Sequence, residues 1–195
     1  MESIFDIMAR RRSVRAYREE QITEEELQTI LEAGRNAPSG GNARTSHLIV
    51  IQNKEVLAKL RDVVEQEFAQ MEYREDLYKS LRVSIKASQA GGYEFFFRAP
   101  TLIVVSNRIG YGNAMADSSC VLENMMIAAT ALNVGSCWIN QLHWLDEHAA
   151  VREFLYGLGM GENETVCGAL ALGYPANEDA FKVLNKNGNV ITYIR

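Results

Sequence analysis

The sequence predicts one α+β domain in which a mostly buried sheet is covered by helices on both faces. Three short apolar runs, residues 47–51, 101–105 and 167–173, have the length and composition of buried strands. Longer segments with apolar residues at helical spacing lie between them, above all residues 56–71 and 114–133. The 195 residues are 47% hydrophobic, which is enough for one sizeable core, and no repeat or linker divides the chain.

Capping residues predict two helices in the N-terminal part of the chain. A short helix begins after Ser3 and runs into a cluster of arginines. Thr23 and Glu26 have the spacing of a capping box, which indicates the start of a second helix. This helix is expected to end around Gly34, and residues 37–42 follow as a glycine-containing loop.

The middle of the chain is predicted as a strand over residues 47–51, buried on both faces, and the helix over 56–71. From residue 73 to 98 the pattern is looser, with one short helix and then an aromatic run after Gly91 and Gly92. Two interpretations of this segment stay open. It is either a flap that faces a substrate or ordinary packing beneath a long connection.

The C-terminal half follows the same plan of strands covered by helices. Residues 136–139 are predicted to be extended, and Asp146 is predicted to cap a helix before the strand over 167–173. Residues 190–194 have strong strand character, but no partner strand is predicted nearby.

Charge and composition exclude several classes of function. The net charge of −5 argues against nucleic acid as the main partner, because such binding usually needs a basic face. No apolar run resembles a secretory signal or a membrane span, so no membrane partner is expected. The odd number and wide spacing of the cysteines indicate reduced thiols in a cytoplasmic protein. The three histidines lack metal-ligand spacing and are expected to be structural, so no metal site is predicted.

A basic cluster near the start of the chain predicts an anion site. Arg11, Arg12 and Arg15 surround Ser13, and their guanidinium groups can bond phosphate oxygens in pairs. A solvated basic face is the alternative for such a run taken alone. On an acidic protein, however, a local cluster of this kind favours a small anionic ligand.

Several motifs occur in a characteristic order. They are Arg11-Arg12-Ser13-Val14-Arg15, Ala37-Pro38-Ser39-Gly40-Gly41-Asn42, Ala99-Pro100, Leu132-Asn133-Val134-Gly135, Trp138-Ile139-Asn140 and Ala171-Leu172-Gly173-Tyr174-Pro175. Together they resemble the FMN-dependent nitroreductases, the nitro/flavin reductase superfamily. The resemblance implies a central mixed, mostly antiparallel sheet flanked by helices. It also implies an intertwined homodimer with FMN at the interface. Residues 1–195 would form a single FMN-binding domain whose C-terminal strand pairs with the partner subunit.

The resemblance also implies which residues hold the phosphate end of FMN. Arg11, Ser13 and Arg15 match the family's contacts to the phosphate and ribityl chain. Arg12 matches a main-chain contact to the ribityl chain or ring edge. The family usually places a basic pair near its C-terminus, and here Lys186 is the one candidate, because an asparagine precedes it.

A second group of residues is implied to lie against the flavin ring. The segment that reaches across from the partner subunit contains Pro38, Ser39, Gly40 and Asn42. Asn140 and Gln141 match positions whose main-chain N–H groups face the reactive nitrogen of the ring. Residues 44–46 depart from the family's usual Gln-Pro-Trp, which changes the cavity wall and leaves substrate preference open.

The implied activity is hydride transfer from NADH or NADPH through bound FMN to a small electron-poor acceptor, such as a nitroaromatic or quinone, with ping-pong kinetics. No catalytic side chain is required, because the cofactor carries the difficult step. The alternative is an FMN-binding regulatory or storage protein with little turnover. The choice of nicotinamide, the physiological acceptor, reductive dehalogenation and oxygen-dependent breakdown of the flavin all stay open.

Overall fold

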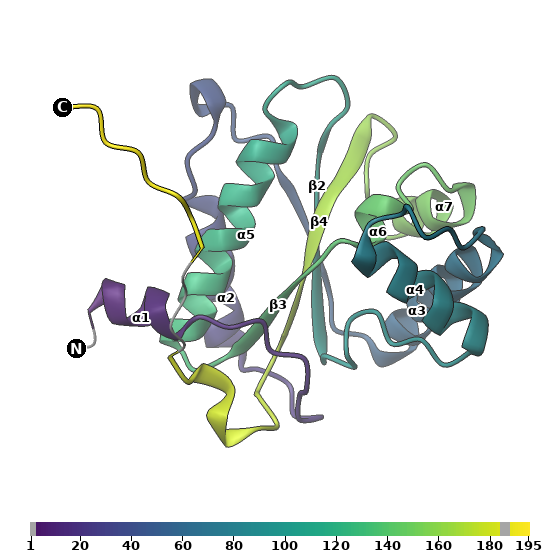
Figure 1. Ribbon diagram of the computed structural model, residues 1–195, viewed down its shortest axis with the longest axis horizontal. Helices are drawn as coiled ribbons and strands as arrows, with labels where there is room; N and C mark the ends of the chain where they lie inside the picture. The colour runs from purple at the N-terminus through teal and green to yellow at the C-terminus, as the bar shows by residue number, and fades with distance from the viewer. Residues whose placement is uncertain (1–2, 184–187) are drawn as a thin grey trace.

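A four-stranded antiparallel sheet forms the centre of the molecule, and helices lie on both of its faces (Figure 1). The computed structural model describes residues 3–183 and 188–195. The strands are β1 (His47–Ile51), β2 (Thr101–Arg108), β3 (Gly135–Ile139) and β4 (Glu164–Gly173), in the order β1-β2-β4-β3. The predicted fold class is confirmed. Each pair of neighbouring strands is antiparallel, and an isolated bridge between Ser13 and Ser136 adds a parallel contact.

The helices of the described residues begin and end close to the predicted positions, except for a short helix after β3 that was not predicted. They are α1 (Ile4–Arg10), α2 (Glu24–Arg35), α3 (Lys54–Gln70), α4 (Lys79–Ala90), α5 (Ala114–Ala131), α6 (Gln141–Trp144) and α7 (Ala149–Gly157), with short 3-10 turns η1 (Gly40–Asn42) and η2 (Glu178–Phe181). The predicted capping box of α2 is formed, because Thr23 and Glu26 each bond the other's main-chain N–H. Ser3 and Asp6 form the same arrangement at α1.

The sheet separates two apolar cores. On one face α2 and α5 pack around Ile30, Leu122 and Met125. On the other face α3, α4, α6 and α7 cover a core that contains Phe68 and Ile85. Figure 1 shows these two groups of helices on opposite sides of the strands. Because helices cover both faces, β2 is buried along nearly its whole length.

Two local predictions are wrong. β1 is not buried on both faces, because it is the edge strand of the sheet and Val50 is 37% exposed. Asp146 does not cap a helix, since α7 begins after His148. Its carboxylate instead accepts hydrogen bonds from the Val166 N–H at 2.8 Å and the Thr165 hydroxyl at 2.6 Å. Asp146 therefore fixes the beginning of β4.

The structure supports the packing interpretation for part of residues 73–98, and the flap interpretation stays a prediction. Phe95 and Phe96 are buried in the core, as ordinary packing predicts. Tyr93 and Phe97 instead line a cavity, together with the first half of α4. The segment thus forms one wall of this cavity.

Residues 188–195 form no strand within this single chain. Their apolar side chains are exposed, and Val190 and Ile194 reach 93% and 97% exposure. Pairing of residues 190–194 with a partner subunit therefore stays a prediction.

Candidate functional site

The arginine-containing segment after α1 is fixed by a buried residue at its centre. Val14 is buried, and its N–H donates to the Ser136 carbonyl at 2.9 Å. The Tyr17 hydroxyl donates to the Val14 carbonyl at 2.7 Å. Side chains of an extended segment alternate in direction, so Ser13 and Arg15 point away from the core that holds Val14.

Ser13 and Arg15 lie at a cavity of about 340 Å³, here called the arginine cavity, which Arg12 also lines. Arg12 Nη1 donates to the Lys182 carbonyl at 3.1 Å, and Arg15 Nη1 lies 3.4 Å from the Ser13 carbonyl. Neither guanidinium group has a carboxylate partner among residues 3–183 and 188–195. Asp179 also lines the cavity, so two cations face one carboxylate and the cavity carries net positive charge.

Arg11, another predicted phosphate contact, is not among the residues that line this cavity. Arg11 faces α5, where its Nε lies 3.6 Å from Glu123 Oε1. Lys186 lies outside the described residues. The structure thus brings together Arg12, Ser13 and Arg15, and the roles of all five residues stay predictions.

A larger cavity of about 510 Å³, the aromatic cavity, lies between α4, the end of β3 and the start of α6. Arg15 lines both this cavity and the arginine cavity, so the two are neighbours. The aromatic side chains in its lining are Tyr78, Tyr93, Phe97, Trp138 and Trp144. Flat apolar walls beside a cationic cavity suit a planar ring that carries a phosphate on a flexible arm.

The predicted ring contacts, Asn140 and Gln141, also line the aromatic cavity. The Asn140 side chain accepts a hydrogen bond from Trp138 Nε1 at 2.6 Å, which fixes the turn after β3. Gln141 is the first residue of α6, and its N–H has no acceptor inside that helix. This N–H is therefore available to a ligand in the cavity.

A polar network joins α4 to α6 at the cavity wall. The Tyr93 hydroxyl lies 2.7 Å from Ser84 Oγ and accepts a hydrogen bond from Gln141 Nε2 at 2.8 Å. Burial raises the pKa of Tyr93 more than these two contacts lower it, so its hydroxyl stays neutral. The network holds the turn after β3 against α4. No local pattern singles out Ser84, because its role depends on how α4 packs against Tyr93 and Gln141.

The thiol in the aromatic cavity is not an activated nucleophile. Cys137 lies on β3 and lines the cavity. Burial raises the pKa of its thiol, although nearby Arg15 and a contact with Ser13 act in the opposite direction. The thiol is therefore protonated at neutral pH.

The histidines are structural, as predicted. The Nδ1 atoms of His47, His143 and His148 lie 3.0, 2.7 and 2.7 Å from Glu164 Oε2, the Val166 carbonyl oxygen and Glu67 Oε2, respectively. Each histidine thus joins two elements of the fold.

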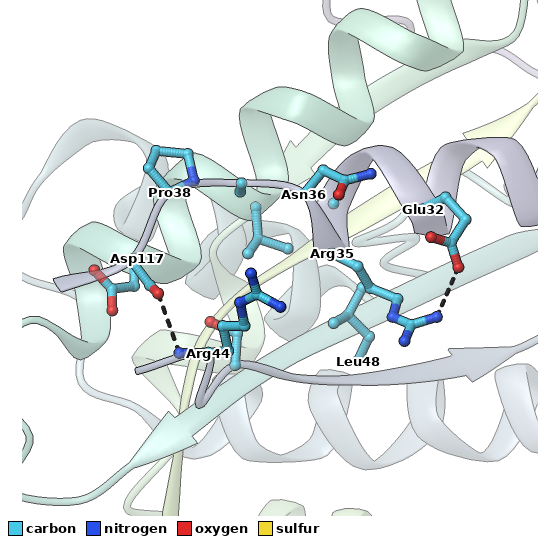
Figure 2. Close-up of a pocket in the computed structure, with 12 residues that line it drawn as sticks. Glu32, Arg35, Asn36, Pro38, Arg44, Leu48 and Asp117 are labelled. Atoms are coloured by element: carbon cyan, nitrogen blue, oxygen red, sulfur yellow. Dashed lines mark hydrogen bonds and ion pairs between the residues drawn. The ribbon is translucent and has the colours of Figure 1, made fainter. Parts of the chain in front are cut away.

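The glycine-containing loop lies at a third cavity of about 300 Å³, the loop cavity (Figure 2). Pro38 and Ser39 line it, and Gly40 and Asn42 follow in η1. Ser39 Oγ accepts a hydrogen bond from the Arg44 N–H at 3.1 Å. Figure 2 shows the Arg44 side chain extending into the cavity, whereas Arg35 pairs with Glu32 on α2.

The loop cavity has no lining residue in common with the arginine and aromatic cavities. The predicted site residues therefore form two groups on one chain. One group contains Arg12, Ser13, Arg15, Asn140 and Gln141, and the other is the loop over residues 38–42.

A model of the nitroreductase family matches residues 8–174, which is most of the chain. The chain belongs to the nitroreductase family. The crystal structure of a nitroreductase from Bacteroides fragilis with bound FMN superposes with a TM-score of 0.84 at 37% identity, and the match covers 100% of both chains.

Curated relatives of this nitroreductase family member have names that fit this family. A protein of Archaeoglobus fulgidus, provisionally named an NADH dehydrogenase/NAD(P)H nitroreductase, is 30% identical over 93% of this chain and 90% of its own length. A 4-nitrobenzoate reductase of Nocardioides is 26% identical over 90% of this chain and 81% of its own length. These relatives confirm the predicted class, an NAD(P)H-dependent flavin oxidoreductase of the nitroreductase type.

The residues present fit FMN, the cofactor of the solved relative. The arginine cavity offers net positive charge to a phosphate, and the aromatic cavity offers flat walls to a ring. Arg15 lies where the two cavities meet.

No helix of the described residues is both long enough and apolar enough to cross a membrane.

Proposed function

We propose that this protein is an FMN-dependent oxidoreductase that transfers electrons from NADH or NADPH to a nitroaromatic, quinone or similar electron-poor acceptor. When bound, FMN supplies the chemistry, because it takes a hydride from the nicotinamide and reduces the acceptor. The observation that carries the proposal is the cationic cavity joined to an aromatic cavity at Arg15. Family membership and the FMN bound to the Bacteroides fragilis relative support it.

The residues of this chain then bind FMN and orient its ring. Ser13 and Arg15 hold the phosphate, as the resemblance implies, and the Arg12 guanidinium joins them because it lines the same cavity, in addition to its expected main-chain contact. A hydrogen bond to such a charged group contributes about 1.5–3 kcal/mol. Main-chain N–H groups at Asn140 and Gln141 donate to the ring edge and stabilise negative charge that develops there. One aromatic cavity serves nicotinamide and acceptor in turn, which leads to ping-pong kinetics.

The proposal includes a homodimer in the cytoplasm, with residues 1–195 of each copy forming a single domain. The loop over 38–42 lies at a different cavity from the arginines, so it would reach the flavin of a second copy. Exposed apolar side chains on α1 and near the C-terminus support an interface. They are Ile4, Phe5, Met8, Val190, Ile191 and Ile194.

Reconstitution with FMN tests the proposal. We expect a yellow protein whose visible absorption is bleached, without oxygen, by NADH or NADPH. The double variant Arg12→Gln/Arg15→Gln should bind FMN at least about tenfold more weakly, because two charge-assisted contacts are lost. Arg18→Gln is the matched control, since Arg18 is exposed and lines neither cavity.

Three outcomes distinguish an oxidoreductase, a passive flavin-binding protein and a protein that binds no FMN. Bleaching by one nicotinamide supports the oxidoreductase and identifies its reductant. An FMN-bound protein that neither nicotinamide bleaches is a passive flavin holder. A chain that takes up no FMN contradicts both.

A further inference from the structure

We propose that the acceptor is a planar aromatic molecule that carries a carboxylate or similar anionic group, and that Lys79 binds this group. The inference rests on the proposed function, because the acceptor would be reduced beside the flavin ring in the aromatic cavity. It adds a substrate class and a specificity residue to that site.

The charge of the aromatic cavity is the first argument. Its ionisable lining contains two permanent cations, Arg15 and Lys79, and no aspartate or glutamate of the described chain. Arg15 is engaged at the junction with the arginine cavity, where its guanidinium also lies 5.8 Å from the centre of the Phe97 ring. A cavity lined by charge of one sign attracts the opposite sign. Lys79 therefore remains for an anion other than the phosphate.

The three cations of α4 differ in their partners, and this is the second argument. Arg82 pairs with Glu75 at 2.5 Å, and Lys86 lies 5.2 Å from the centre of the Tyr73 ring. Lys79 makes no ion pair, hydrogen bond or ring contact with any residue of 3–183 or 188–195. It is also the one of the three that lines the aromatic cavity.

An aromatic surface lies directly beside Lys79. Tyr78 precedes it, is 69% exposed and also lines the cavity. Its ring meets Trp144 edge to face, with the ring centres 6.1 Å apart. A large exposed ring at a cavity mouth offers a stacking surface. A ligand with an aromatic ring and an anionic substituent can contact both Tyr78 and Lys79.

The reaction considered is the first reduction of a nitro group. In balance it is ArNO₂ + NAD(P)H + H⁺ → ArNO + NAD(P)⁺ + H₂O. The nicotinamide loses two electrons, and the nitro group loses one oxygen as water. The carboxylate takes no part, so contact with Lys79 should act on binding and appear in KM more than in kcat.

The test compares 4-nitrobenzoate with the neutral, nearly isosteric 4-nitrobenzamide, using the FMN-loaded protein. Lys79→Gln should lower kcat/KM for the acid by about tenfold, as expected for the loss of one charge-assisted contact, and change the amide less than about twofold. Lys86→Gln, on the same helix but outside the cavity lining, should change neither. Taking the acid-to-amide ratio in each variant cancels the different reactivities of the two compounds.

A binding measurement separates this inference from the proposed function. Calorimetric titration of the oxidised FMN-loaded protein with benzoate and benzamide needs no turnover. Tighter binding of benzoate that is lost in Lys79→Gln supports the inference, even if NAD(P)H never bleaches the flavin. Equal binding of the two compounds, or equal losses for acid and amide in Lys79→Gln, overturns it while leaving the oxidoreductase intact.

Discussion

Asp117 shows how one buried carboxylate can position the glycine-containing loop from another element. It lies on α5, is 6% exposed, and accepts hydrogen bonds from the Gly40 N–H at 3.0 Å and the Tyr111 hydroxyl at 2.9 Å. Gly40 fits because it lacks a side chain. A Cβ there would lie 2.1 Å from Asn113 Nδ2 and 2.9 Å from the Tyr111 hydroxyl oxygen. The loop is thus fixed from α5 and from the turn before it.

We expect Asp117→Asn to destabilise the protein by about 1–2 kcal/mol, because a buried charge-assisted acceptor is replaced by a weaker one. FMN affinity should also fall, since the loop that would contact the flavin loses its position. Urea unfolding and FMN titration measure the two effects. Asp62→Asn, at an exposed site on α3, should change stability by no more than about 0.5 kcal/mol. An unchanged FMN affinity in Asp117→Asn would contradict a contact between this loop and the flavin.

At this scale the sequence identified residues whose chemistry is visible locally. Guanidinium groups around Ser13 and the glycines of the loop form short patterns, so they could be singled out. Local pattern could not single out Asp117, Tyr78 or Lys79, because their roles depend on which distant elements pack around them.

Glu164 joins three strands of the sheet. It lies at the start of β4 and contacts His47 of β1 at 3.0 Å and the Ser106 hydroxyl of β2 at 2.9 Å. The Gly161 N–H donates to the same carboxylate at 3.0 Å. Burial alone would raise the pKa of Glu164, but these hydrogen bonds outweigh burial and lower it below the ordinary value of 4.5.

This lowered pKa predicts a pH-dependent contribution to stability. The folded state favours the ionised carboxylate, so the contribution is fully present above pH 4.5 and is lost as the pH falls through the lowered pKa. Glu164→Gln should therefore be less stable than the native protein at pH 7, and the difference should shrink in acid. Urea unfolding at several pH values measures it, with exposed Glu162→Gln as the control. A difference independent of pH would contradict this account.

Elements with strong local signals were predictable, and their junctions were not. The capping box at Thr23 and the helical periodicity of α3 and α5 depend on neighbours in sequence. Asp146 has the appearance of a helix cap, yet it bonds Val166 across twenty residues because β4 begins beside it. Local pattern cannot distinguish these two uses of a carboxylate.

At the scale of the whole molecule, the predicted flavin contacts lie at separate cavities of the chain. The loop over residues 38–42 lies at one, and Arg12, Ser13 and Arg15 lie at another. The sequence predicts the two layers of helices. The strand order β1-β2-β4-β3, which makes β1 an edge strand, is set by contacts between distant segments. The proposed homodimer would bring the loop over 38–42 of one copy to the arginine cavity of the other.

The double variant Val190→Asp/Ile194→Asp tests this arrangement. Both side chains are almost fully exposed in the single chain, so the substitutions should cost little there. In a dimer that buries them, two new charges at the interface should shift the protein toward monomer and weaken FMN binding. Sedimentation velocity and FMN titration measure both, with Arg195→Gln as the control. A dimer of unchanged stability would show that these residues lie outside the interface.

The aromatic cavity contains both tryptophans of the chain, Trp138 and Trp144. Any molecule that enters it approaches each indole ring, and no indole elsewhere contributes background emission. The intrinsic fluorescence of the unlabelled protein therefore reports on occupancy of this one place. Candidate ligands can be ranked by quenching before any of them is known to react.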